Sequence, residues 1–166
     1  MDSTEISLSS CIDHYCHAVW EANLSRAYRG ILSALLAFKS GWEAAHPEDS
    51  VGSLYQGYLD MSFVAIAPAA FGARRLKISL VYLHADGRFT LWLTAGNRSI
   101  QAEVSNELAK KPLGAYSLTV LKPGVDAIIS KDIPLPYFFD EPERLTAHLM
   151  DATEHFLFDM SVLLEA

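Results

Sequence analysis

The sequence predicts an α+β fold, in which a mostly antiparallel sheet of four or five strands is packed by N-terminal and C-terminal helices. Three observations lead to this class. Strand-like segments flank an Asp-Gly pair at residues 86–87, two helix-like segments precede them, and a long amphipathic segment ends the chain. In chain order, we expect the core elements to be a helix, three strands, a helix and a strand.

The centre of the predicted sheet is a hairpin over residues 76–95. Asp86 and Gly87 tolerate the positive φ of a type I′ turn, so we expect them to form a two-residue loop. One face of this hairpin is then apolar, while the other carries Trp92 among hydroxyl groups and is either solvated or the floor of a site. The expected pairs on the apolar face are His84 with Phe89, Tyr82 with Leu91, Leu80 with Leu93, and Ile78 with Ala95, and those on the other face are Leu83 with Thr90, Val81 with Trp92, and Ser79 with Thr94.

The helices are predicted from apolar residues at helical spacing and from capping residues. The first is expected over residues 6–22, and Ser25 is expected to cap the second. Asn97 is expected to cap a helix over residues 98–110. Asp140, with a glutamate three residues later, fits the capping-box pattern and is expected to begin the last helix.

The remaining segments supply the other strands. Alternating side chains over Tyr55 to Ala67 predict the first strand, which places Asp60 in its middle. Residues 116–121 are expected to form a further strand. Residues 125–133 fit either a short strand or an irregular segment.

Composition restricts the class of partner. The chain of 166 residues is most simply one domain over residues 1–166, with half of its residues apolar and a fifth charged. A formal net charge of −7 argues against a nucleic-acid surface, which normally has a basic stripe. Apolar stretches fall short of a membrane span, and the start, Met-Asp-Ser-Thr-Glu, differs from a signal peptide. We therefore expect a cytoplasmic protein that binds neither nucleic acid nor membrane.

Two clusters of His, Cys and carboxylate residues resemble metal sites. The cluster from Cys11 to His17 scatters around a helix, whereas a structural zinc site needs four converging ligands. The cluster from His148 to His155 lacks the Glu-x-x-His pairs of diiron bundles and fits a solvated helix face. We predict no tightly bound metal and no cofactor.

Catalytic signatures are missing from the sequence. It contains no Gly-x-Ser-x-Gly elbow and no phosphate-binding glycine loop. The element order resembles that of restriction-endonuclease-like nucleases, which hold Mg²⁺ with an acid on the second strand and an acid-x-Lys on the third. This chain has Asp86 at the turn and Thr90-Leu91-Trp92 at the third-strand position. An enzyme of that fold lacking its metal ligands is therefore the alternative interpretation.

Three segments carry a resemblance to a known family. They are Tyr-Gln-Gly-Tyr-Leu-Asp-Met at 55–61, Leu-Lys-Ile-Ser-Leu-Val at 76–81, and Phe-Thr-Leu-Trp-Leu-Thr-Ala-Gly-Asn-Arg-Ser-Ile-Gln at 89–101. This pattern resembles a bacterial family of domains of unknown function, over most of the chain from the second helix onward. The resemblance implies a bacterial cytoplasmic protein and supplies no activity.

The less apolar face of the hairpin carries the candidate site. Trp92 stands where a solvated sheet more often has Thr or Lys, and Asp60 needs a partner or a raised pKa if it lies within a strand. The free N–H groups at Asn97, together with Arg98, can hold an anion. We expect a small anionic ligand there, while a solvated face with one helix cap stays open. The expected rim residues are Tyr55, Tyr58 and Gln101.

These observations favour a non-catalytic module that binds a small ligand or a partner protein. Leu157, Phe158 and Val162 lie outside the apolar stripe of the last helix. They exceed what one helix face buries, and a symmetric dimer is the commonest cover for such a surplus. We therefore predict a homodimer through the C-terminal helix.

Overall fold

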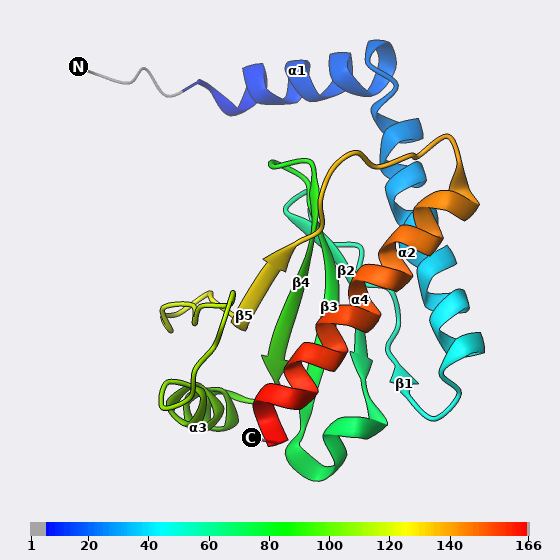
Figure 1. Ribbon diagram of the computed structural model, residues 1–166. Helices are drawn as coiled ribbons and strands as arrows, with labels where there is room; N and C mark the ends of the chain where they lie inside the picture. The colour runs from blue at the N-terminus through cyan, green and yellow to red at the C-terminus, as the bar shows by residue number, and fades with distance from the viewer. Residues whose placement is uncertain (1–5, 166) are drawn as a thin grey trace.

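The computed structural model describes residues 6–165 and confirms the predicted α+β class. The five strands form one sheet in the order β1-β2-β3-β4-β5, and every neighbouring pair is antiparallel. The N-terminal pentapeptide used above to argue against a signal peptide lies outside the described residues. The elements are α1 (Leu8–Glu21), α2 (Leu24–Ala45), β1 (Ser50–Val51), β2 (Met61–Ala67), the 3₁₀ helix η1 (Ala69–Arg74), β3 (Leu76–Leu83), β4 (Arg88–Ala95), α3 (Arg98–Leu108), β5 (Ala127–Asp132) and α4 (Pro142–Glu165) (Figure 1).

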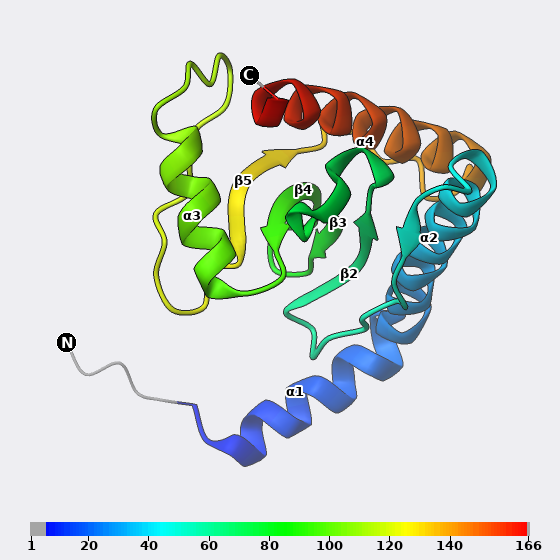
Figure 2. The same ribbon diagram turned by 90° about the horizontal axis from the view of Figure 1, so that it is seen from below.

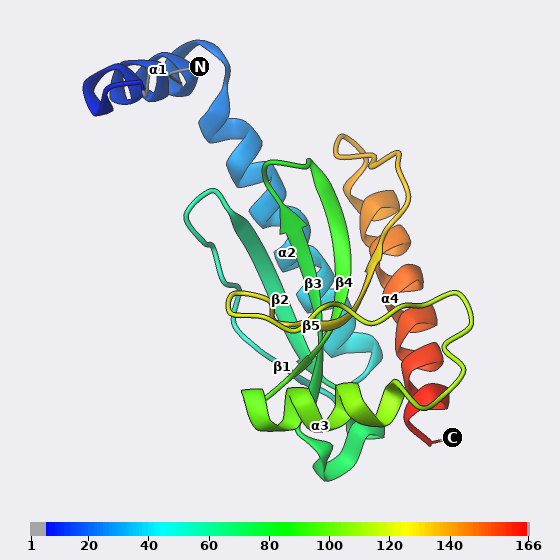
Figure 3. The ribbon, with the colours of Figure 1, turned by 90° about the vertical axis from the view of Figure 1, so that its left-hand side faces the viewer.

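The helices are distributed unequally over the two faces of the sheet. α2 and α4 lie side by side on one face, as Figure 2 shows. On the opposite side, α3 crosses only one end of the sheet, and α1 projects away from the body (Figure 3). The core therefore lies between the sheet and the α2–α4 pair. Its fully buried members include Leu35, Phe38, Trp42, Val64, Ile66, Ile78, Leu80, Leu91, Leu93, Leu149 and Phe156.

The hairpin of β3 and β4 has a longer loop than predicted. Leu83 pairs with Arg88, so residues 84–87 form the loop. Gly87 has a φ of 63° and donates its N–H to the carbonyl of Leu83 at 2.9 Å, but Asp86 has a negative φ, so the type I′ turn was wrong. The register moves by two residues, which keeps every side chain on its predicted face.

The first strand begins later than predicted. Met61 is its first residue, and Tyr55 forms only an isolated bridge with Phe63. Gly57 has a φ of 73°, and a Cβ there would lie 1.8 Å from the carbonyl oxygen of Met61. The chain therefore folds back on itself before β2, and Asp60 lies in this loop rather than in mid-strand.

Three other boundaries differ from prediction. Residues 116–121 form no strand, because β5 pairs with β4 and leaves Leu118 a single bridge to Ile129. α2 begins at Leu24, so Ser25 is not its cap. α4 begins at Pro142 rather than at Asp140, since proline suits the first helical turn, where its missing N–H is not needed.

The apolar surplus on α4 is smaller than predicted. Leu157 packs against the core, while Phe158 and Val162 are 68% and 49% exposed. The homodimer through this helix stays a prediction. Among residues 6–165, the helices are all too short or too polar to cross a bilayer.

Gly87 provides the stability test of the hairpin. Replacing Gly87 with Ala should lower the free energy of unfolding by about 1 kcal/mol, because an L-residue resists positive φ. The matched change Gly30→Ala lies in α2 with open space around it and should raise stability by up to about 1 kcal/mol. Chemical denaturation of both variants measures the difference, and equal stabilities would contradict the loop geometry.

Candidate functional site

A cavity of about 340 Å³ lies on the sheet face opposite α2 and α4, beside the start of α3. Side chains alternate between the two faces along each strand, and this alternation determines which residues form the floor of the cavity. In β2, Val64 and Ile66 point into the core, so Met61, Phe63 and Ala65 face the cavity.

Trp92 forms the central aromatic group of this floor. It is half-buried and pairs across the strands with Ser79 rather than with the predicted Val81. Ser79 and Thr90 on the same face are 5% and 1% exposed. The face is therefore neither fully solvated nor covered by a helix, and Trp92 borders an open cavity.

The start of α3 forms one end of the cavity. The side-chain oxygen of Asn97 accepts the N–H of Ile100 at 2.9 Å, which caps the helix as predicted. Arg98 pairs with Asp126 at 3.0 Å and also donates to the carbonyl of Val125. The predicted anion seat is thus partly occupied by the protein's own carboxylate.

Lys77 is the second cation at this end. It lies opposite Thr94 in the ladder, lines the cavity and is exposed. The ion pairs among residues 6–165 do not include it. Lys77 is therefore the cation with its charge still available to a ligand.

Gln101 supports the site from beneath. Its side chain is buried, and its amide nitrogen donates to the carbonyls of Val125 and Asp126 at 3.0 and 3.1 Å. Its amide oxygen accepts from Arg98 at 2.8 Å. These bonds use its hydrogen-bonding groups within the protein, so Gln101 positions Arg98 and the 125–126 segment while it also lines the cavity.

The other predicted site residues lie away from the cavity. Asp60 precedes β2, and its carboxylate accepts the N–H of Tyr58 at 2.9 Å. Backbone N–H groups of Tyr58 and then Met61 hold the pKa of Asp60 below its usual value. Tyr58 is 90% exposed, and Tyr55 reaches the floor only by stacking on Phe63 at 4.8 Å. The structure thus gathers Trp92, Asn97, Arg98 and Gln101 but separates them from Asp60, Tyr55 and Tyr58.

His84 in the hairpin loop makes a second polar cluster near Asp60. Its Nε2 lies 2.9 Å from the hydroxyl of Ser62, which donates to the carbonyl of Gln56. Because that hydroxyl proton is used, neutral His84 donates from Nε2. Burial lowers the pKa of His84, and the charge of Asp60 opposes this only in part.

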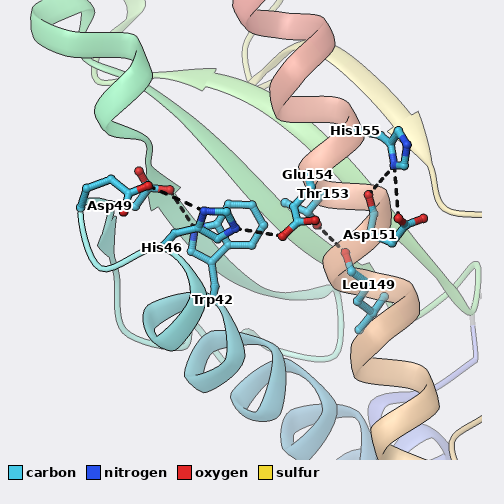
Figure 4. Close-up of polar contacts among 9 residues, drawn as sticks. Trp42, His46, Asp49, Leu149, Asp151, Thr153, Glu154 and His155 are labelled. Carbon is cyan, nitrogen blue, oxygen red and sulfur yellow. Dashed lines mark hydrogen bonds and ion pairs between the residues drawn. The ribbon is translucent and has the colours of Figure 1, made fainter.

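One group of possible metal ligands joins the end of α2 to the loop after it. Among residues 6–165, His46, Glu48 and Asp49 bring ligand atoms within 4.8 Å of one another. Asp49, however, accepts the indole N–H of Trp42 at 2.9 Å (Figure 4). It also accepts the backbone N–H of Ala69 at 2.8 Å. His46 stacks on Trp42 and bonds to Glu154 of α4 at 2.9 Å. These contacts explain the cluster as a joint between elements.

Two kinds of site residue escaped the sequence reasoning. Phe63 and Met61 are apolar like their core-facing neighbours, so the strand is apolar on both faces, and this pattern is itself a signal of a lined cavity. Asp126 lies in a segment that the sequence left open, and it reaches Arg98 only through the fold.

Comparison with known proteins gives one match. A family model described as a domain of unknown function, DUF7000, matches residues 8–164. This agrees with the resemblance carried by the three motifs. The comparisons with curated proteins and with solved structures each find no match.

The His84 cluster predicts a pH dependence of stability. The folded protein keeps His84 neutral below its unfolded pKa of about 6.5, so protonation favours unfolding. Stability should therefore fall as the pH drops from 7.5 through 6.5 towards the lower folded pKa. His84→Gln should reduce this fall, while His155→Gln, an exposed control, should not. Denaturation across pH 5–8 measures it, and identical profiles for all three proteins would contradict the assignment.

The two hydrogen bonds of Asp49 predict that this residue stabilises the fold without a bound metal. Asp49→Asn should cost about 1–3 kcal/mol, because the new amide group opposes one of two N–H donors. Glu48→Gln should change stability little. Thermal melting with added Zn²⁺ or with chelator should give the same values for the wild-type protein. A Zn²⁺-dependent rise that is lost in Glu48→Gln would instead establish a metal site.

Proposed function

We propose that this chain, which belongs to the DUF7000 family, is a non-catalytic module that binds a small anionic ligand in the cavity beside Trp92. The observation that carries the proposal is the meeting of an aromatic floor with two cations at the start of a helix. We include the cytoplasmic location in this proposal, on the composition of the sequence.

The size of the cavity restricts the ligand. A volume of about 340 Å³ is at the low end of small-molecule sites. Met61, Phe63 and Trp92 offer apolar surface on one side, while Lys77 and Arg98 lie at the other end. This arrangement suits a compact molecule with a flat apolar part and one anionic group.

The charges in the cavity favour an anion locally. Lys77, Arg98 and Asp126 are the charged residues that line it, so cations outnumber acids two to one. An anion near Arg98 must share the guanidinium with Asp126, whereas Lys77 has no such competitor among the described residues. Helix N–H groups at Asn97 add to the positive potential. We therefore assign the main ionic contact to Lys77.

The lining also favours binding over catalysis. The lining residues include neither His nor Cys, and the hydroxyls of Ser79 and Thr94 have no neighbouring base to activate them. The nuclease-like alternative gains no support here, because β3 and β4 consist of residues without carboxylates. A partner protein on this face remains the other form of a binding function.

The test compares benzoate with benzamide, which share a ring and differ in charge. Benzoate should shift the Trp92 indole resonance in a saturable way, and benzamide should do so at least tenfold more weakly. Lys77→Gln should remove this preference at unchanged melting temperature, because Lys77 forms no ion pair with any of residues 6–165, whereas Trp92→Ala should weaken both probes.

Arg144→Ala is the matched control for Arg98→Ala, since both arginines are surface residues in ion pairs. Only the Arg98 change should weaken benzoate. A spectrum in which neither probe moves Trp92 at millimolar concentration would reject the cavity as an anion site.

A further inference from the structure

α1 is a helix that the rest of the domain leaves largely uncovered. None of its 14 residues is buried, and it projects from the body of the molecule (Figures 1 and 3). Only its C-terminal half approaches the domain, where Tyr15 and Val19 border a hollow of about 240 Å³ with Tyr28 and Leu59.

A helix of this length is marginal in water without a tertiary partner. Ser7 caps it by accepting the N–H of Ser10 at 3.2 Å, but its first turn has no acid and its last turn no base to favour the helix dipole. Its order therefore depends on a partner for its apolar stripe.

The stripe has the spacing of a coiled-coil seam. Leu8, Ile12, Tyr15 and Val19 follow intervals of four, three and four residues, which places them alternately at d and a positions. The e and g positions that flank this seam carry uncharged residues. These residues are Ser9, Cys11, Cys16 and Ala18.

The acidic and histidine residues of α1 lie outside the seam and its flanks. They are Asp13, His14, His17 and Glu21. Two copies of an acidic protein can therefore bring their α1 seams together without placing like charges opposite each other.

We propose that α1 pairs with α1 of a second copy of this chain through the seam of Leu8, Ile12, Tyr15 and Val19. A lipid surface is a poorer occupant, because α1 has neither Lys nor Arg on its polar face to meet anionic headgroups.

The exposed area fits a reversible dimer. Taking on the order of 200 Å² for a large side chain, Leu8, Ile12, Tyr15 and Trp20 together expose roughly 540 Å² per chain, against about 800 Å² in a standard interface. Trp20 contributes from the Cys16 flank, one turn nearer the domain. The exposed fractions are 75% for Leu8, 51% for Ile12, 56% for Tyr15 and 87% for Trp20.

Analytical ultracentrifugation over micromolar to millimolar concentration tests the pairing. The wild-type protein should be a reversible dimer, and Ile12→Glu should weaken it at least 100-fold. His14→Glu introduces the same side chain outside the seam and should leave the dimer unchanged. Thermal melting of the domain should be alike in all three, since α1 has no buried residue.

Two results would overturn the proposal. One is a wild-type monomer throughout this range. The other is a dimer that survives Ile12→Glu but is lost in Phe158→Glu, which would assign the interface to α4.

The two exposed thiols give an independent readout. A short bis-maleimide should link two copies through Cys11 and Cys16, and Ile12→Glu should abolish the link. In a parallel pair Cys11 lies beside the partner's Cys16, so Cys11→Ser or Cys16→Ser alone prevents linking. In an antiparallel pair each flank meets the same flank of the partner helix, so the remaining thiol lies nearest its own counterpart and the single variants still link. Equal linking in the wild type and in Ile12→Glu would contradict the seam.

Discussion

The antiparallel pairing of β3 with β4 determines where the candidate functional side chains lie. It places Ser79 opposite Trp92 and Lys77 opposite Thr94 on the face without α2 and α4. Because β4 runs directly into the cap of α3, the end of the strand that carries Lys77 is also the end where Arg98 begins the helix. One ladder thus brings an aromatic floor and two cations to the same place.

The same ladder shows what a sequence can and cannot predict about a sheet. The faces of β3 and β4 were predictable, because side chains alternate and a slip of one residue would exchange the core with the solvent. The length of the loop was not predictable, because a register shift of two residues leaves both faces intact. Local residue preferences do not distinguish the two registers. The observed register is supported by a bond from the His84 N–H to the carbonyl of Asp60, 24 residues earlier in the sequence.

The candidate site divides in the same way. Trp92, Asn97, Arg98 and Gln101 belong to one continuous strand-to-helix segment, so their proximity follows from local structure. The predicted position of Asp60 depended on where the first strand begins. The chain reversal at Gly57 places Asp60 outside that strand. Helix boundaries failed for a related reason. The stripes of α2 and α4 were evident, but Asn23 precedes the first residue of α2 and makes no side-chain capping bond, so a capping pattern does not mark this helix start.

The overall charge of the protein and the charge of the cavity have opposite signs, and distance reconciles them. A net charge of −7 repels an approaching anion at long range. At physiological ionic strength, however, charges on the surface are screened over about 8 Å. Among the residues that line the cavity, Lys77 and Arg98 are cations and Asp126 is the one carboxylate, and α3 begins beside them. A ligand that fits entirely inside the cavity experiences chiefly these groups, whereas a large polyanion would also meet the acidic remainder of the surface. This distribution of charge is the reason that we propose a small anion, rather than a large polyanion, as the ligand.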